Sequence, residues 1–186
     1  MRWDELFDDL EAQFAAQNAA ELAGEVADRT RRERALVELA DRLVARLGHP
    51  LVVHLTGGST HRGVLTDVAQ QWLVLQGPVL VPVGAITGVT GLSTGAVTTG
   101  REGVRRRISL GSALRAVARD RSPVQVGLVD GALPAGTLDA VGADHVDLAE
   151  HHPDEPRRAG VVRSVRTIPF AAVAWVRPAP GSSTLV

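Results

Sequence analysis

The chain has 186 residues, of which 45% are hydrophobic and 22% charged, a balance typical of a globular protein. It has no Cys, and all 20 basic residues are Arg, which excludes disulfides, thiol nucleophiles, a phosphate-loop lysine and Schiff-base chemistry. The net charge is near zero, but residues 1–28 hold eight acidic residues and one Arg, so the remainder is basic. Because no apolar run approaches the roughly 20 residues of a membrane span, we expect a cytoplasmic protein without a membrane segment.

An acidic amphipathic helix is predicted at the N-terminus. Trp3, Phe7, Leu10 and Phe14 recur at helical spacing, and carboxylates occupy the opposite face. Such a stripe either packs on the rest of its own chain or binds in the groove of a partner protein. Because leucines continue the helical period as far as a glycine at position 48, residues 1–48 are predicted to form an N-terminal helical segment.

From residue 51 the apolar period changes to that of a β-strand. Strands are predicted near residues 51–56, 60–68, 72–76, 79–83 and 85–90. The dipeptides Gly57-Gly58 and Gly77-Pro78 are typical of tight turns. Five short strands in a meander close most easily as a small barrel, which is predicted over residues 49–92 and is followed by a Gly/Thr/Arg linker at 93–108.

The same pattern occurs a second time. Residues 40–75 align without a gap on residues 113–148, with identical pairs such as Gly58/Gly131 and Gly63/Gly136. Later in the repeat the shift grows by fourteen residues, which predicts a long loop between the third and fourth strands of the second copy. The predicted fold is therefore α+β, with N-terminal amphipathic helices followed by two tandem five-stranded antiparallel barrels, each preceded by a helix. The second helix is expected at 110–121, the helix-plus-barrel domain at 109–178 and a tail at 179–186.

Three short motifs support a resemblance to the Sm-like branch of small SH3-type barrels. They are Val53-x-Leu55-x-x-Gly58, Gly63-x-Leu65 and Trp72-Leu-Val-Leu75, with counterparts around Gly131, Gly136 and Leu148. The resemblance covers residues 35–92 and 108–178, and the whole chain resembles a two-barrel family of high-GC Gram-positive bacteria. Sm proteins bind RNA through an Asp and an Asn after the second strand. The matching segments here read Ala-Gln-Gln-Trp and Gly-Ala-Asp-His, so the resemblance does not imply that RNA site.

The sequence predicts a binding function rather than catalysis, because it contains no nucleophile elbow, dinucleotide fingerprint or zinc-protease helix. We expect a non-enzymatic adaptor without cofactor or metal, which engages a protein partner through Trp3, Phe7, Leu10 and Phe14. Pairing of strand edges into a homo-oligomer is left open. The alternative is an RNA- or DNA-binding regulatory protein that contacts phosphates through clustered arginines. These are Arg101, Arg105, Arg106, Arg107, Arg157 and Arg158.

One loop contains residue types that bind metals, namely His151, His152, Asp154 and Glu155. Because two prolines interrupt this loop, neighbouring side chains are not expected to converge on one ion, and a solvated loop is favoured.

Two histidines and two tryptophans complete the set of candidates. His54 and His61 are expected to be exposed on the first barrel. Trp72 and Trp175 are expected to pack in a core or between the barrels, since Trp is highly buried on average. A platform on which a base stacks is the alternative for either ring.

Overall fold

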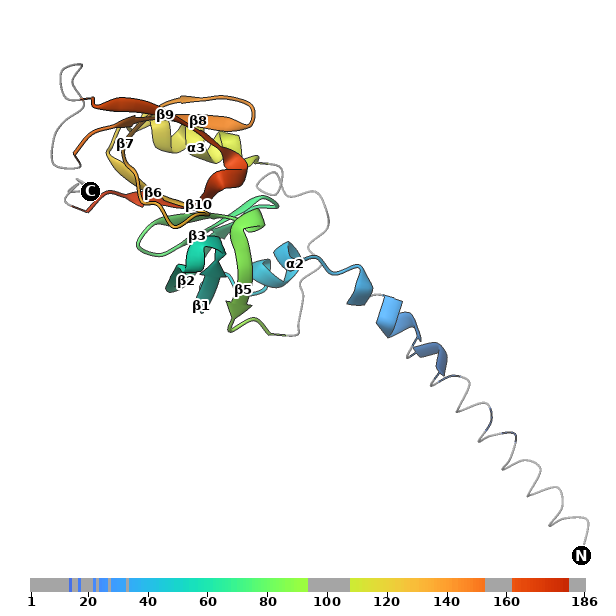
Figure 1. Cartoon of the computed structure of the whole chain (residues 1–186). Helices are drawn as coiled ribbons and strands as arrows, with labels where there is room; N and C mark the ends of the chain where they lie inside the picture. The colour runs from blue at the N-terminus through green and yellow to red at the C-terminus, as the bar shows by residue number, and fades with distance from the viewer. Residues whose placement is uncertain are drawn as a thin grey trace, which may run out of the picture. The chain divides into compact units, whose positions relative to one another are not determined.

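The computed structural model describes residues 14, 17, 22, 24–26, 28–32, 34–93, 108–152 and 162–180 (Figure 1). The chain divides into two compact units, Met1–Glu38 and Leu39–Val186. In the first unit the described residues from 14 to 35 are helical, and Arg31 forms an ion pair with Asp28. No helix in the described ranges is long and apolar enough to cross a membrane.

The described part of the second unit contains two short α-helices and ten strands. Its first half comprises α2 (Leu39–Val44), β1 (Pro50–Leu55), β2 (Thr60–Val68), β3 (Trp72–Leu75), β4 (Val79–Pro82) and β5 (Ile86–Thr90). Its second half comprises α3 (Leu110–Arg119), β6 (Val124–Leu128), β7 (Ala135–Val141), β8 (His145–Glu150), β9 (Ser164–Pro169) and β10 (Val173–Pro178). Single 3₁₀ turns follow β1, β4 and β9, at Thr56–Gly58, Val83–Ala85 and Phe170–Ala172. The positions expected for the first five strands are confirmed to within about two residues.

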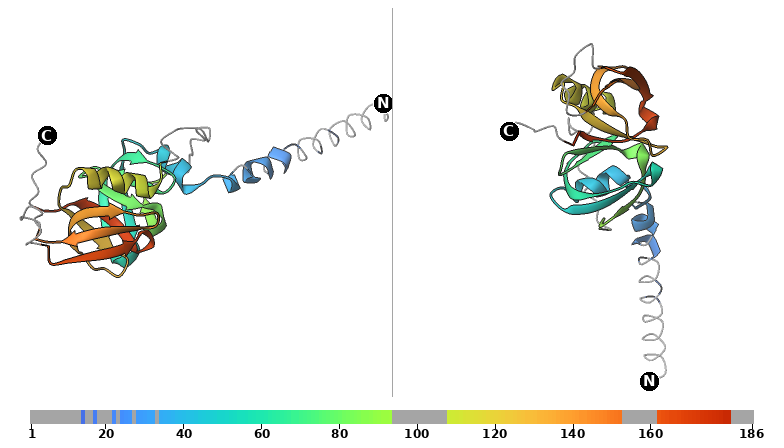
Figure 2. Two further views of the ribbon diagram at one scale, coloured as in Figure 1. Left: turned by 90° about the horizontal axis from the view of Figure 1, so that it is seen from above. Right: turned by 60° about the vertical axis from the view of Figure 1, so that its left-hand side comes forward.

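The ten strands form one antiparallel sheet in the order β5-β1-β2-β3-β4-β10-β6-β7-β8-β9. The two halves join where Leu80 of β4 pairs with Val176 of β10, so the blue-green and orange-red strands lie side by side in Figures 1 and 2. The prediction of two separate five-stranded barrels, each preceded by a helix, is therefore wrong. The strands belong to a single sheet that is not closed, and α2 and α3 are only six and ten residues long.

The barrels do not separate because β3 and β4 carry apolar side chains on both faces. Leu73 lies in the core of the first half, whereas its neighbour Trp72 points the opposite way and is also buried. Leu80 of β4 is buried on the same side as Trp72. An apolar outer face is stable only when another layer covers it. Here the second half of the sheet and α3 provide that cover.

The two halves exchange tryptophans between their cores. The core of the first half is formed by α2 and β1–β4, yet it also contains Ala174 and Trp175 from β10. The core of the second half is formed by α3 and β6–β10, yet it also contains Trp72 and Leu80. Because a buried indole contributes a large apolar area, each half depends on the other for part of its interior.

Candidate binding groove

An apolar groove of about 720 Å³ lies where the first half of the sheet meets α3. Its floor is formed by apolar side chains from both halves, namely Trp72, Val74, Leu80, Val117, Val124 and Val176. The floor comes from five elements, the strands β3, β4, β6 and β10 and the helix α3, which meet at the β4–β10 joint. Its volume falls within the roughly 300–1,000 Å³ of pockets that bury most of a bound ligand.

Three hydrogen bonds fix the beginning of α3 beside this floor. Ser109 caps the helix, since its Oγ accepts a 3.2 Å hydrogen bond from the Ser112 amide. The Leu110 amide donates to Oε1 of Gln71 at 2.9 Å. The indole Nε1 of Trp72 donates to the carbonyl oxygen of Ile108 at 3.0 Å. The turn between β2 and β3 therefore holds the N-terminus of α3, and with it one wall of the groove.

Charged side chains of both signs stand at the rim, which includes Asp67, Arg119, Asp120 and Arg177. Arg177 is held in place because its Nη2 and Nε donate to Oε1 of Gln125 at 2.7 and 3.2 Å. Its guanidinium also lies 4.9 Å from the ring centroid of Trp175, in a cation–π contact. A groove with an apolar floor and a charged rim is suited to burying an apolar group of a ligand. The charged side chains of the rim can then pair with polar groups at the two ends of that ligand.

The groove has two serines in its lining, and their hydroxyls are engaged locally. The Ser112 hydroxyl lies 3.0 Å from that of Ser109. The Ser122 hydroxyl donates to the carbonyl oxygen of Asp120. Neither contact is the serine-to-base hydrogen bond that activates a nucleophile.

His61 departs from its expected exposure. It is half-buried, and its ring meets the edge of Trp175 with centroids 5.0 Å apart and planes at 69°. Burial lowers the pKa of the His61 imidazole below its ordinary 6.5, and the nearby positive charge of Arg177 lowers that pKa further. His61 thus belongs to the interior around Trp175. His54 is exposed, as predicted.

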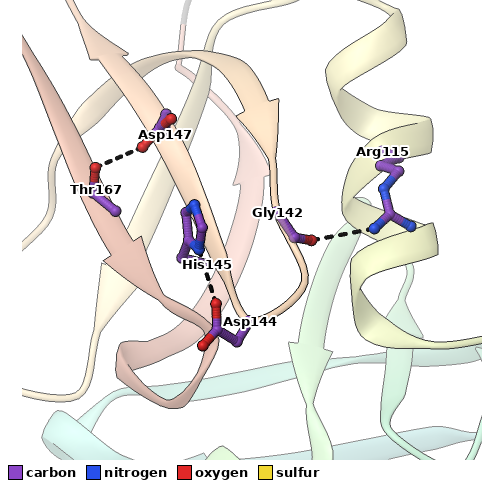
Figure 3. Close-up of polar contacts among 6 residues, drawn as sticks. All are labelled: Arg115, Gly142, Asp144, His145, Asp147 and Thr167. Carbon is purple, nitrogen blue, oxygen red and sulfur yellow. Dashed lines mark hydrogen bonds and ion pairs between the residues drawn. The ribbon is translucent and has the colours of Figure 1, made fainter.

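A polar face covers the other end of the sheet, on β8 and β9 (Figure 3). The Thr167 hydroxyl donates to Asp147 at 2.6 Å, and Nδ1 of His145 lies 2.8 Å from a carboxylate oxygen of Asp144. The hydrogen bond from His145 lowers the pKa of the exposed Asp144 carboxyl. Arg115 of α3 donates to the carbonyl oxygen of Gly142 at 3.2 Å, which ties the helix to the β7–β8 turn.

A second hollow of about 420 Å³ is polar and lies beside the end of β8. Glu150 and Arg166 form an ion pair within it at 2.6 Å, so one of its two arginines is neutralised. His151 is buried, with its Nε2 2.8 Å from the Thr137 hydroxyl and its Nδ1 2.9 Å from the carbonyl oxygen of His152. Among the described residues no group of three or more His, Cys, Asp or Glu could hold a metal ion.

Most of the site residues predicted from sequence fall outside the described ranges. These are Trp3, Phe7 and Leu10 of the N-terminal stripe, and Arg101, Arg105, Arg106, Arg107, Arg157 and Arg158 of the basic clusters, together with Asp154 and Glu155 of the loop. Phe14 is described and is 66% exposed. The predicted phosphate contacts therefore lie outside the described residues.

The groove itself was missed at the level of sequence, although one signal for it exists. Trp72 and Val74 alternate with Leu73 and Leu75, so all four residues of β3 are apolar. A strand that is apolar on both faces must be covered on both, which places a second layer over Trp72 and Val74.

Comparisons of the chain with models of protein families, with curated proteins and with solved structures each found no match.

Proposed function

We propose that the protein is a non-enzymatic adaptor whose groove binds an apolar peptide segment of a partner protein. The observation that carries the proposal is the groove, in which Trp72, Val74, Leu80 and Val117 form an apolar floor inside a charged rim. An apolar centre with a polar rim is the usual anatomy of a protein–protein interface.

The shape of the groove favours a peptide over a compact ligand. The lining follows α3 from Ser112 to Arg119, about 10 Å of helix axis, and continues past its end to Pro123. A segment in an extended conformation advances about 3.3 Å per residue, so several residues of a peptide would fit along the wall. Rim charges of both signs are suited to the polar groups that flank an apolar segment.

The helical residues of the first unit would supply the second binding surface that an adaptor needs. Phe14, Leu22 and Val26 are 66%, 63% and 58% exposed, and their spacing of eight and four residues puts them on one side of a helix. Trp3, Phe7 and Leu10 would continue this stripe toward the N-terminus. We propose that the stripe binds the groove of a protein partner, as amphipathic helices commonly do.

The groove is tested with the full-length protein and a fluorescent apolar dye, anilinonaphthalene sulfonate, followed by selection from a library of random short peptides. We expect the dye to bind and the selected peptides to be apolar in their centre and to displace it. Val117→Arg, which places a charge on the apolar floor of the groove, should weaken both affinities by about tenfold or more.

Val165→Arg is the matched control, because Val165 is exposed on β9 and lies outside the groove. It should leave both affinities unchanged. If the dye binds but no peptide is selected, the groove takes a small apolar molecule and the peptide proposal is wrong. Dye binding that Val117→Arg does not weaken would mean that the dye lies elsewhere and that the groove is not a binding site.

A further inference from the structure

The strand order of the sheet is the same in both halves. If the strands of each half are numbered one to five along the chain, their order in the sheet is fifth, first, second, third and fourth in both halves. The two runs are β5-β1-β2-β3-β4 and β10-β6-β7-β8-β9. The joint therefore pairs the fourth strand of one half with the fifth strand of the other. In the described part of the chain, β9 and β5 are the equivalents of these two strands, and each has a neighbouring strand on one side only. By geometry alone, β9 of one copy could pair with β5 of a second copy.

The side chains at the free β9 end differ from those at the joint. At the joint, Trp72 lies opposite Pro82 and Val74 opposite Leu80. At the free end the same register places His145 opposite Pro169 and Asp147 opposite Thr167. Three large apolar residues that face the second half at the joint, namely Trp72, Val74 and Leu80, are thus replaced by polar ones, namely His145, Asp147 and Thr167 (Figure 3).

The free β5 edge differs from β10 in a matching way. In the joint, Trp175 lies opposite Gly127 and its ring enters the core of the first half. At the corresponding place on β5, Gly88 lies opposite His54. At this position the strand that would approach another copy therefore has no side chain to insert in place of the indole. Both tryptophans that the halves exchange are missing from the two free edges.

We infer that the free edges β5 and β9 are built to prevent a second copy from adding to the sheet. Adding a copy at β9 would bury the polar side chains of His145, Asp147 and Thr167, which are partly or fully exposed in a single copy, and removing polar groups from water is unfavourable. It would also leave the joint without either indole. Polar residues on an edge strand are a common means of blocking edge-to-edge association. A head-to-tail joint between copies would otherwise extend into a ring or a filament.

This inference goes beyond the proposed function and does not depend on it. It concerns which surfaces are closed to a further copy of the chain, whereas the adaptor proposal concerns which surface is open to a partner. The groove lies at the joint inside the molecule and would be present in a single copy.

The experiment restores the joint at the two free edges in separate full-length proteins. The first variant carries His145→Trp, Asp147→Val and Thr167→Leu, which copies the joint surface onto β8 and β9. The second carries Gly88→Trp and His54→Gly, which copies the Trp175–Gly127 pair onto β5. We expect the two variants, when mixed, to form a one-to-one complex in sedimentation velocity, with slowed amide exchange in β9 of the first and β5 of the second.

Amide exchange at the edges separates this joint from any association through other segments. Wild-type β5 and β9 amides should exchange at rates that do not change with protein concentration. Protection of these amides in concentrated wild-type protein would overturn the inference, as would folded variants that do not combine. Should the second variant not fold, the concentration series on the wild type still decides the question. The control for non-specific association is a third variant with Thr60→Trp, Arg62→Leu and Thr66→Val, three exposed positions on β2, which is not an edge strand. It should not combine with the second variant.

Discussion

Gly127 lies opposite Trp175 across β6 and β10, and a Cβ atom at Gly127 would overlap the indole ring. The ring reaches the core of the first half only because position 127 has no side chain. We expect Gly127→Ala to lower the free energy of unfolding by about 1–3 kcal/mol, the usual range for an overpacked core. Urea-induced unfolding measures this, with Gly84→Ala as the control, since a Cβ there meets nothing within 4 Å.

A double-mutant cycle isolates the contact between these two residues. In a Trp175→Leu background the ring is gone, so adding Gly127→Ala should have little further effect. If the alanine lowers stability equally in both backgrounds, the overlap with Trp175 is not the cause.

Alanine substitutions at Gly57 and Gly58 distinguish the loss of stability caused by backbone strain from the loss caused by a clash between the two halves. Both have positive φ, +79° and +77°, so an alanine at either should cost about 1 kcal/mol. At Gly57 an added Cβ would also lie 2.9 Å from the carbonyl oxygen of Leu128, whereas at Gly58 it meets nothing within 4 Å. We expect Gly57→Ala to lower the free energy of unfolding by at least about 1 kcal/mol more than Gly58→Ala. Equal effects would mean that the 57–128 contact contributes nothing.

The lowered pKa of His61 predicts a dependence of stability on pH. Because the folded state disfavours the protonated imidazole, the unfolded state binds more protons once the pH falls toward 6.5. This contribution to stability is complete above pH 6.5 and is lost as the pH falls below that value, until His61 also protonates in the folded state. We expect His61→Gln to lose less stability than wild type between about pH 7 and pH 5. His54→Gln, which changes an exposed imidazole, is the control. If the free energy of unfolding of His61→Gln depends on pH as steeply as that of the wild type, the prediction is wrong.

Trp72→Phe tests the hydrogen bond that holds the start of α3. The substitution keeps an aromatic ring in the second core but removes the donor to the Ile108 carbonyl oxygen. We expect it to lower the free energy of unfolding by about 1–2 kcal/mol and to speed amide exchange in the first turn of α3. Gln71→Ala, which removes the acceptor of the Leu110 amide, should speed the same amides. Unchanged exchange in both variants would show that the helix start is held by other contacts.

The sequence located the strands well because their signals are local. The diglycine at 57–58 ends β1 with positive φ at both residues, and the change of repeat shift marks the long connection between Glu150 and Ser164. Helix length was less predictable, since the stripe from Leu36 to Leu47 yields only the six residues of α2, with both of those leucines exposed. The apolar period shows where a helix can form. Tertiary packing decides how much of it does.

The joint between the halves and the groove could not be predicted in the same way. The floor of the groove comes from Trp72, Val117 and Val176, which are far apart in the sequence and share no local pattern. His61 was misplaced because its surroundings depend on register. It lies opposite Val53 and is covered by Trp175, which arrives from the other half of the chain. Periodicity alone carries no information about such a partner.

The position of β10 determines the order in which the chain can complete its fold during synthesis. As residues leave the ribosome one after another, β1–β5 appear long before Ala174 and Trp175, which the core of the first half needs. Until then β4 also lacks β10, the strand with which its Leu80 pairs. The first half therefore remains incomplete until nearly the whole described chain has been translated. A nascent chain stopped before Val173 should remain exposed to chaperones and proteases along β3 and β4.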